Sequence, residues 1–338
     1  MMIECNQEEI TKNWNPSTSA PLVSICCITY NHESYIEQAL HGFLMQETSF
    51  PFEILIHDDA SSDKTPNIIQ KYEKKYPDIV KPIYQTENQY SKGNDVIQIN
   101  LARSQGKYIA ICEGDDYWID PHKLQKQVDF LETHPEYSMC FHKAQLKFES
   151  NLYTDLTEQD IQDKCYSATE LLERWIAPLA SIVMKRSCAF YPLKNKAAIL
   201  TGDIFIIFSC LAMGKVWGFS KAMSVYRVNQ GGVSHNPSHK KNNLMRLPDN
   251  WESFKQNFPF APQKRLKKIL AFHYWQRSRI QPTLKLSLMD RRKAISYSPM
   301  ISFFMIFRPA VMSFAMFLGR FFDKTKVMNF ISNITHRI

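Results

Sequence analysis

The sequence predicts an α/β protein built on a doubly wound sheet, because apolar strand-like runs alternate with amphipathic helical segments between residues 21 and 135. Two of these runs end in clusters of carboxylates, at 58–63 and at 113–116. In open α/β sheets, ligands bind outside the carboxyl ends of the strands. The order of the elements therefore predicts both the class of fold and the edge of the sheet where a site should lie.

Strands and helices follow one another in this first part. Residues 22–29 are a continuous apolar, β-branched run, the pattern of a strand buried on both faces. A capping box at Ser34 and Glu37 predicts the next helix, and the Thr-Pro pair at 65–66 and the Asp-Pro pair at 120–121 each predict an N-cap followed by proline. The expected strands are 22–29, 52–57, 79–84 and 107–112, and the expected helices begin near 34, 65, 94 and 120.

The second part of the chain is less regular. A second capping box, at Ser167 and Glu170, precedes a short helix, and residues 204–213 form a strongly apolar helix. We expect short strands at 181–184 and 215–227, a polar glycine-containing loop at 229–243, and a helix at 264–280. The expected fold is therefore a mixed α/β sheet followed by a helical C-terminal extension.

Composition limits the class of protein. Apolar residues make up 44% of the chain and charged residues 22%, which is typical of a globular protein. The eight cysteines are scattered without metal-binding spacing, and residues 1–15 lack the basic and apolar regions of a secretory signal. We therefore expect a reduced, cytoplasmic setting.

Charge is distributed unevenly. Residues 239–338 carry 19 Lys and Arg against 4 Asp and Glu, a balance of +15, so residues 1–238 carry −7 of the total of +8. A basic region of this kind binds anionic membrane surfaces or nucleic acid. The region has no zinc ligands, stacking motifs or helix-turn-helix pattern, so we do not expect nucleic acid as a partner. Its Phe-rich segment 303–322 suits an interfacial membrane element, and a helical pair packed on the body remains an equal alternative.

The hexapeptide at 113–118, Glu-Gly-Asp-Asp-Tyr-Trp, is the most informative motif. Asp115 and Asp116 follow a buried strand, and two adjacent like charges cost energy unless a cation or a donor offsets them. A carboxylate pair at this place suits a hard divalent cation and, through it, a diphosphate. The acidic turn at 58–63 suits a nucleobase or a ribose, although Asp and Ser are also common in helix-entry turns.

Two further candidates are weaker on their own. Asp203 stands at the start of an apolar helix, where Asp is very often an N-cap. His235 follows a glycine pair at 231–232, and it could bind a metal or a diphosphate, but most loop histidines have no such role.

Four blocks in this order resemble the family 2 inverting glycosyltransferases, which have the GT-A fold. The blocks are residues 23–31, 58–63, 106–109 and 113–118, and the resemblance covers about residues 21–235. The bacterial branch that builds capsules, O-antigens and other surface polysaccharides is the most similar. The resemblance implies an N-terminal extension (1–20), a GT-A domain (21–238) with a nucleotide-binding half (21–135) and an acceptor half (136–238), and a separate basic region (239–338).

The resemblance also implies roles for single residues. Asp58 would bind the nucleobase, commonly uracil, and Asp115 would contact the ribose or uridine. Asp116 would bind Mn²⁺ or Mg²⁺ on the donor diphosphate. Asp203 matches the Gly-Asp at which the family places its catalytic base, a role distinct from helix capping.

Further donor contacts are implied by the first and last blocks. Thr29, Tyr30 and Asn31 belong to the first block and would line the donor site. Arg227 begins the late loop that closes over donor and acceptor in the family. His235 follows that loop and remains the further candidate metal ligand that the residues alone suggest.

The likeness has departures. Residues 100–103 lack the usual Arg-Asn pair, and the Gln-x-x-Arg-Trp motif of processive synthases is absent, so transfer of a single sugar is expected. Two alternatives from other classes remain, namely a catalytically inactive adaptor docked at the membrane and a sugar-phosphate nucleotidyltransferase. A nucleotidyltransferase would have a glycine-rich phosphate loop after the first strand. This chain has Tyr-Asn-His-Glu at 30–33 instead, which argues against that alternative.

Overall fold

The computed structural model describes most of the chain. The described residues are 6–14, 20–149, 160–174, 176–195, 199, 202–229, 237–299 and 302, with only the backbone of 237–241. The chain divides into two compact units. Unit 1 comprises Met1–Pro192 and Gly202–His235, and unit 2 comprises Leu193–Thr201 and Asn236–Ile338.

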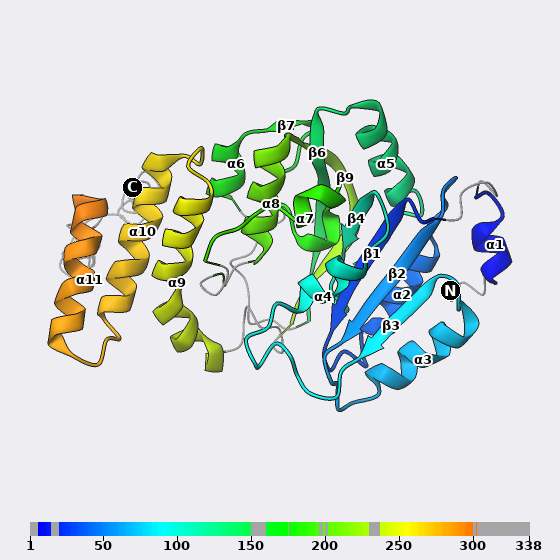
Figure 1. The fold of residues 1–338 in the computed structure, drawn as a ribbon, viewed down its shortest axis with the longest axis horizontal. Coiled ribbons are helices and arrows are strands. Elements are labelled where there is room, and N and C mark those ends of the chain that lie inside the picture. Colours follow the sequence, from blue (N-terminus) through cyan, green and yellow to red (C-terminus); the bar gives the residue numbers. More distant parts are fainter. Residues whose placement is uncertain are drawn as a thin grey trace, which may run out of the picture. The chain divides into compact units, whose positions relative to one another are not determined.

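A mixed sheet forms the centre of unit 1 (Figure 1). Its strands are β1 Val23–Thr29, β2 Phe52–Asp58, β3 Val80–Tyr84, β4 Tyr108–Ile111, β5 Tyr117–Trp118, β6 Tyr137–Phe148, β7 Lys164–Tyr166, β8 Val183–Lys185 and β9 Lys215–Val228. In the described residues they are ordered β3-β2-β1-β4-β8-β6-β9-β5, and β7 pairs with β9. The first four strands in this order are parallel, and β8 is antiparallel to both of its neighbours.

Helices are described in both units. Unit 1 has α1 Gln7–Thr11, α2 Ile36–Leu44, α3 Thr65–Lys75, α4 Val96–Arg103, α5 Lys123–Thr133, α6 Ala168–Glu173, α7 Arg186–Ala189 and α8 Gly202–Met213. A 3-10 turn, η1, spans Leu179–Ser181. Unit 2 has α9 Pro237–Asn257, α10 Gln263–Ser278 and α11 Leu284–Tyr297, with α10 packed against both of the others. Within the described ranges, no helix is both long and apolar enough to cross a bilayer.

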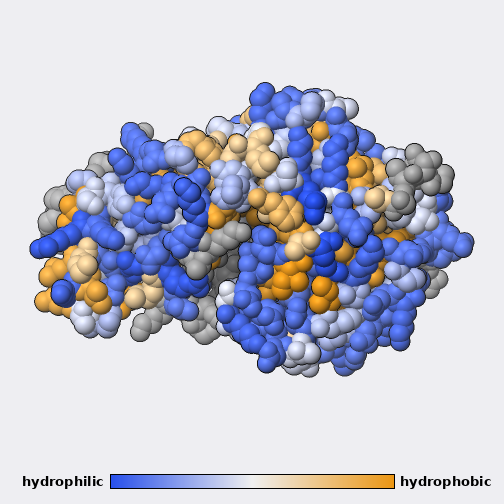
Figure 2. Space-filling model, in the orientation of Figure 1, coloured by the Kyte–Doolittle hydropathy of each residue, from blue (hydrophilic) through white to orange (hydrophobic). Residues whose placement is uncertain are grey.

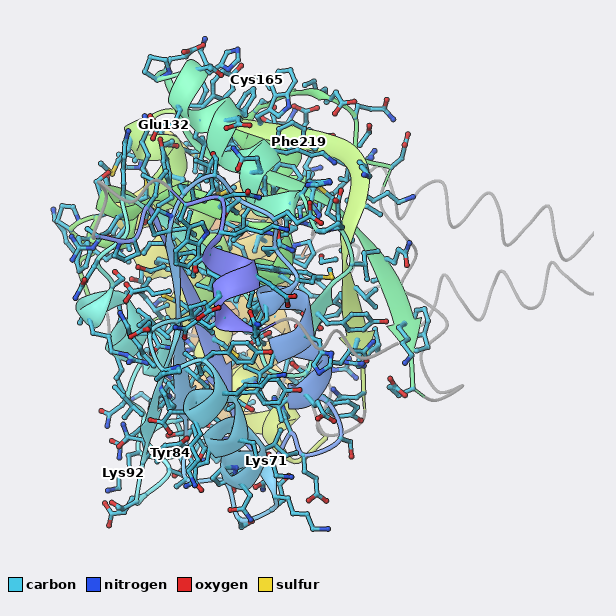
Figure 3. All side chains as sticks on the ribbon, turned by 90° about the vertical axis from the view of Figure 1, so that its right-hand side faces the viewer. Lys71, Tyr84, Lys92, Glu132, Cys165 and Phe219 are labelled. Atoms are coloured by element: carbon cyan, nitrogen blue, oxygen red, sulfur yellow. The ribbon has the colours of Figure 1, made fainter. Side chains whose placement is uncertain are left out.

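The strand order sets the two ends of unit 1. Figure 3 shows Lys71, Tyr84 and Lys92, which belong to α3, β3 and the loop after β3, at one end of this view. Glu132, Cys165 and Phe219, from α5, β7 and β9, lie at the other. In the strand order, β2, β1 and β4 therefore lie between the elements at these two ends.

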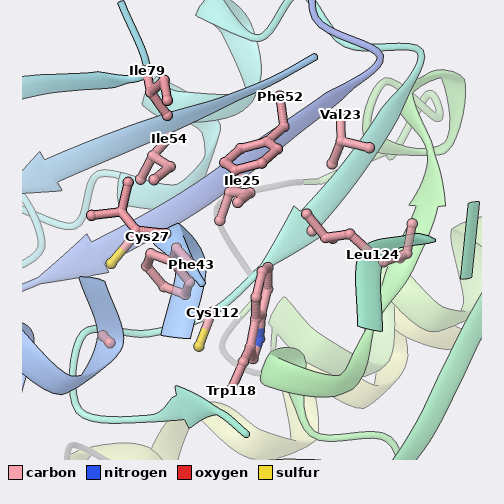
Figure 4. Close-up of a cluster of buried hydrophobic side chains, with 14 of the residues drawn as sticks. Val23, Ile25, Cys27, Phe43, Phe52, Ile54, Ile79, Cys112, Trp118 and Leu124 are labelled. Atoms are coloured by element: carbon pink, nitrogen blue, oxygen red, sulfur yellow. The ribbon is translucent and has the colours of Figure 1, made fainter. Parts of the chain in front are cut away.

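Apolar side chains from β1, β2 and α2 form the core that holds this edge in place (Figure 4). The Phe43 and Trp118 rings meet edge to face, with centroids 4.8 Å apart. The approach is so close that a Cβ on Gly42 would lie 2.8 Å from the Trp118 backbone nitrogen. Glycine at this position therefore lets α2 pack directly on β5, which is formed by the last two residues of the acidic hexapeptide.

Several sequence predictions are confirmed. The four strands expected in the first part correspond to β1–β4, and the mixed α/β sheet with C-terminal helices is present. The Ser167–Glu170 capping box forms, with Ser167 accepting from the Glu170 N–H and Glu170 from the Ser167 N–H. The apolar helix at 204–213 is α8, and the helix expected at 264–280 is α10.

Three predicted helix caps are wrong. Helix α2 begins at Ile36 without a Ser34 cap, α3 has Lys64 as N-cap, and α5 begins only at Lys123. For α3 the reason is that the loop after β1 uses the predicted cap, since the Thr65 hydroxyl accepts the His32 N–H at 2.8 Å. In addition, α9 begins at Pro237 inside the expected loop 229–243, and β6 was not expected at all.

Candidate functional site

The candidate site lies where β1, β2 and β4 end at the same edge of the sheet. Thr29 and Asp58, the last residues of β1 and β2, are register partners. The Asp59 N–H donates to the Thr29 carbonyl at 3.0 Å, and the Gly114 N–H donates to the Ile28 carbonyl at 2.9 Å. The parallel ladder thus brings the three polar loops together, as the sequence predicted.

Cross-loop hydrogen bonds join the loops after β1 and β2. The Asn31 N–H donates to the Ser61 hydroxyl at 2.8 Å, and the Asn31 side-chain oxygen accepts the Ser62 N–H at 2.8 Å. Asn31 has a φ of +52°, a left-handed conformation that Asn tolerates better than most residues. Of the three donor candidates in this block, Thr29 is buried, whereas Tyr30, at 46% exposed, and Asn31 both offer accessible surface.

Asp58 is buried, and its carboxylate accepts the Ser61 hydroxyl at 2.6 Å. Burial raises the pKa of Asp58, and the hydrogen bonds from Ser61 partly offset that rise. The neighbouring Asp59 has a different role, because its two oxygens accept the backbone N–H groups of Gln89 at 2.7 Å and Tyr90 at 3.0 Å. Asp59 therefore fixes the loop that follows β3 beside Asp58.

Asp115 and Asp116 are held by groups from β9 and from the segment that follows it. Asp116 is buried, and its Oδ1 accepts the Arg227 N–H at 2.8 Å. The Asp115 Oδ2 accepts the side-chain amide of Asn229 at 2.9 Å and lies 4.0 Å from the His32 Nε2. Burial, followed by repulsion from Asp115 and Glu113, raises the pKa of Asp116 well above its ordinary value.

Asp203 belongs to the same electrostatic cluster. Burial raises the pKa of Glu113 to about 8, and the charges of Asp115 and Asp203 add to the rise. The pKa of Tyr226 is likewise raised, first by burial and then by Asp116, Glu113, Asp115 and Asp203. Asp203 lies in the first turn of α8, which spans Gly202–Met213, so it is not the N-cap. Four carboxylates from the hexapeptide and α8 therefore act on one region.

Arg227 supplies the opposite charge from inside the protein. Its side chain is 2% exposed, and its Nε lies 3.1 Å from the Glu149 carboxylate. The two terminal nitrogens donate to the Asp115 carbonyl and to the Gln38 side-chain oxygen. The guanidinium also lies between two rings, 4.5 Å from the Tyr117 centroid and 4.9 Å from the Tyr35 centroid. Each of the three guanidinium nitrogens of this residue, predicted to bind the donor, therefore already makes a hydrogen bond to a protein group.

The sequence reasoning did not single out several residues of this site. Glu113 stands inside the hexapeptide, and Asn229 lies two residues after Arg227, so their positions next to known motifs were usable signals. His32 is held by a 3.1 Å contact between its Nδ1 and the Thr29 hydroxyl. Gln38 and Glu149 come from distant parts of the chain, and no local pattern marks them.

A divalent cation fits this chemistry only in part. Asp115 and Asp116 offer the carboxylate oxygens that Mg²⁺ and Mn²⁺ prefer, and the repulsion that raises the pKa of Asp116 would be relieved by a cation. Over the described ranges, no group of three or more His, Cys, Asp or Glu side chains forms a complete cage. An ion here would need further ligands such as donor phosphates. His235 lies outside the described residues.

Solved structures identify the class of fold. The chain superposes on Staphylococcus aureus TarS 1-349 in complex with UDP-GlcNAc, with a TM-score of 0.54 at 17% identity over 84% of this chain and 91% of that one. It also superposes on the mannosyltransferase PcManGT of Pyrobaculum calidifontis, in complex with GDP-Man and Mn²⁺, with a TM-score of 0.52 at 16% identity over 88% and 81% of the two chains. The mixed sheet is thus of the GT-A type.

Sequence comparison gives the family. Residues 24–184 match the model of Glycosyl transferase family 2, so this part of the chain is a family 2 domain. An uncharacterized protein of Mycobacterium tuberculosis is 36% identical over 215 residues, which are 63% of this chain and 60% of the relative. The putative teichuronic acid biosynthesis glycosyltransferase TuaG of Bacillus subtilis is 39% identical over 121 residues, 35% of this chain and 43% of TuaG. The chain thus covers less than two thirds of the length of either relative.

Proposed function

We propose that this chain transfers one sugar, with inversion, from a nucleotide-sugar to a hydroxyl group of a glycan or lipid-linked acceptor in bacterial surface-polysaccharide assembly. The observation that carries the proposal is that Asp58 and the Asp115–Asp116 pair lie at one edge of the sheet, with the charge of Asp203 acting on the neighbouring Glu113. The TarS complex with UDP-GlcNAc and the name of TuaG support a UDP-sugar donor and a polysaccharide product.

The donor would lie across the ends of β1, β2 and β4. Asp58 would accept a hydrogen bond from the nucleobase, and Asp115 would accept one from the ribose. Tyr30, an exposed aromatic residue of the first block, would pack against the base. Asp116 would hold Mn²⁺ or Mg²⁺, as the Mn²⁺ complex of PcManGT suggests, and a bound ion would offset the negative charge of the diphosphate.

Asp203 would act as the general base. Its carboxylate would take the proton of the acceptor hydroxyl as that oxygen forms a bond to the anomeric carbon of the sugar. The bond from that carbon to the diphosphate oxygen breaks at the same time, and the nucleoside diphosphate leaves from the opposite face. One base is enough for inversion by a single displacement.

The kind of acceptor decides where in the cell the chain would work. A lipid-linked acceptor would require the chain to work at the cytoplasmic face of a membrane. We propose that the basic region 239–338 provides that contact, and that the GT-A body between residues 21 and 238 contains both the donor and the acceptor half.

Calorimetric titration of UDP, GDP and CDP, with and without Mn²⁺, tests the donor site. Metal-dependent binding of one nucleotide that is lost in Asp116→Ala is the expected result. Asp203→Asn is the matched control, which should bind the nucleotide as the wild type does while transfer falls by about 10²-fold or more. If no nucleotide binds to the wild type, the chain is better explained as a non-catalytic adaptor.

A further inference from the structure

The strongest feature outside the candidate site is the outward face of α11 in unit 2. Helix α11 packs on α10 through Ser287, Asp290 and Ala294, which are its buried residues. The described residues of the whole chain include twelve exposed large hydrophobic side chains, and five of them lie on this helix of 14 residues. They are Leu284, Leu286, Leu288, Met289 and Ile295. Figure 2 shows hydrophobic surface over α11, set among hydrophilic surface.

Three of these side chains form a ridge. At about 100° per residue, Leu284, Leu288 and Ile295 fall within roughly 40° of one another around the helix axis. Their exposed fractions are 75%, 45% and 45%. Lys285 and Arg292 lie along one side of the ridge, about 40–60° further round the helix, and both are exposed. An apolar ridge with flanking cations is the pattern of a helix that lies in a membrane interface.

The charge of the surrounding unit identifies the partner. Between residues 242 and 299 there are 12 Lys and Arg against 3 Asp and Glu. All three acids are already engaged, because Asp249 and Asp290 pair with Arg277, and Glu252 accepts from the Tyr274 and Tyr297 hydroxyls. No carboxylate in this described stretch therefore remains to neutralise Lys285 and Arg292.

The segment of the chain that follows α11 is a poor occupant for this face by charge. Residues 303–338 carry five Lys and Arg against one Asp, so in water they repel the cations of α11. A second copy of the same basic face would be repelled as well. An anionic lipid bilayer has an apolar interior beneath negatively charged headgroups. It can therefore bury the apolar ridge and bind the cations at the same time.

We propose that the outward face of α11, formed by Leu284, Leu288, Ile295, Lys285 and Arg292, is the surface through which this protein binds anionic lipid bilayers. This inference rests on the proposed action at a membrane, and it assigns that contact to one helix. The leucines and the isoleucine enter the boundary between headgroups and acyl chains, while the two cations bind the anionic headgroups.

Vesicle sedimentation of the full chain tests the assignment. The vesicles are phosphatidylcholine alone or phosphatidylcholine with about one third phosphatidylglycerol, at low and high salt. Binding only to the anionic vesicles, weakened by salt, is expected. The variants Leu284→Ser with Leu288→Ser, and Lys285→Glu with Arg292→Glu, should each lower the partition coefficient about tenfold or more.

A matched control separates position from net charge. Lys264→Glu with Lys267→Glu changes the same charge on exposed residues of α10, and it should retain most of the binding. Equal loss in this control and in the α11 variants would overturn the assignment to α11. So would unchanged binding in the α11 variants, or binding to a DNA duplex in place of vesicles. Each variant is also titrated with UDP, since intact vesicle binding without UDP binding would contradict the donor site and leave the lipid surface standing.

Discussion

Arg227 offers a sharp test of how this site is built. The resemblance to family 2 implies that it contacts the donor, whereas its hydrogen bonds in the structure go to protein groups. We predict that Arg227 acts as a positioning residue for Asp115 and Asp116. Its backbone N–H is present whatever the side chain, so side-chain variants leave the 2.8 Å hydrogen bond to Asp116 available and test the guanidinium alone.

The expected cost can be worked out from the contacts. Arg227→Met removes the donor from three acceptors, Glu149, Gln38 and the Asp115 carbonyl, at about 1 kcal/mol each. Two ring contacts add about 0.5 kcal/mol each, giving a loss of roughly 4 kcal/mol in the free energy of unfolding. Arg227→Lys keeps the charge but cannot serve three acceptors at once, so about half of that loss is expected.

The decisive variant is Gln38→Leu, because Gln38 supports Arg227 without belonging to the proposed donor site. It should lower stability by about 1 kcal/mol and weaken Mn²⁺-dependent UDP binding roughly fivefold, measured by urea unfolding and calorimetry. Gln70→Leu, at an exposed glutamine on α3, is the matched control and should change neither. The reasoning is refuted if Gln38→Leu binds UDP normally while Arg227→Lys loses binding at unchanged stability, since a direct donor contact would give that pattern.

Three other changes follow from the same structure. In Gly114→Ala the new Cβ would lie 2.6 Å from the Thr29 hydroxyl, so nucleotide affinity should fall, and unchanged calorimetric titrations would contradict the close packing. Asp59→Ala removes the acceptor of two N–H groups and should free the loop after β3, with a stability loss of about 1–3 kcal/mol and faster hydrogen exchange at Gln89 and Tyr90. Burial lowers the pKa of Lys123 to about 7 in the folded chain, below its ordinary 10.5, so the unfolded chain binds the extra proton between these values. Stability should therefore rise with pH across that window by up to about 1.4 kcal/mol per pH unit relative to Lys123→Met, and parallel pH profiles of the two proteins would disprove it.

The first half of the fold could be predicted from local patterns. Continuous apolar runs such as 22–29 mark strands buried on both faces, because side chains on either side of the sheet must leave water. The hexapeptide at 113–118 could likewise be placed at a strand end, since the strand before it is fully buried. These features depend only on residues that are close together in the sequence, so they can be predicted from it.

The caps of α2, α3 and α5 and strand β6 could not be predicted in the same way. Thr65 and Asp63 look like helix-capping residues, yet they accept the N–H groups of His32 and Glu33 from the loop after β1. Strand β6 has a second half that is only partly buried and mixes polar with apolar residues, and its pairing with β9 brings together residues some 80 positions apart. A side-chain oxygen accepts a hydrogen bond from whichever donor the fold brings close to it. Local sequence patterns do not show which donor that will be.

The sequence by itself determined that this is an α/β protein, where its first four strands end, and that Asp58, Asp115, Asp116 and Asp203 are the acidic residues to consider. Only the tertiary structure decided that Asp59 supports a loop while Asp58 bonds to Ser61, and that Glu113 joins the carboxylates. It alone placed Arg227 between two rings with Gln38 and Glu149. The physical reason is that strand periodicity is a local property, whereas burial, charge repulsion and hydrogen-bond partners depend on which distant segments the sheet brings together.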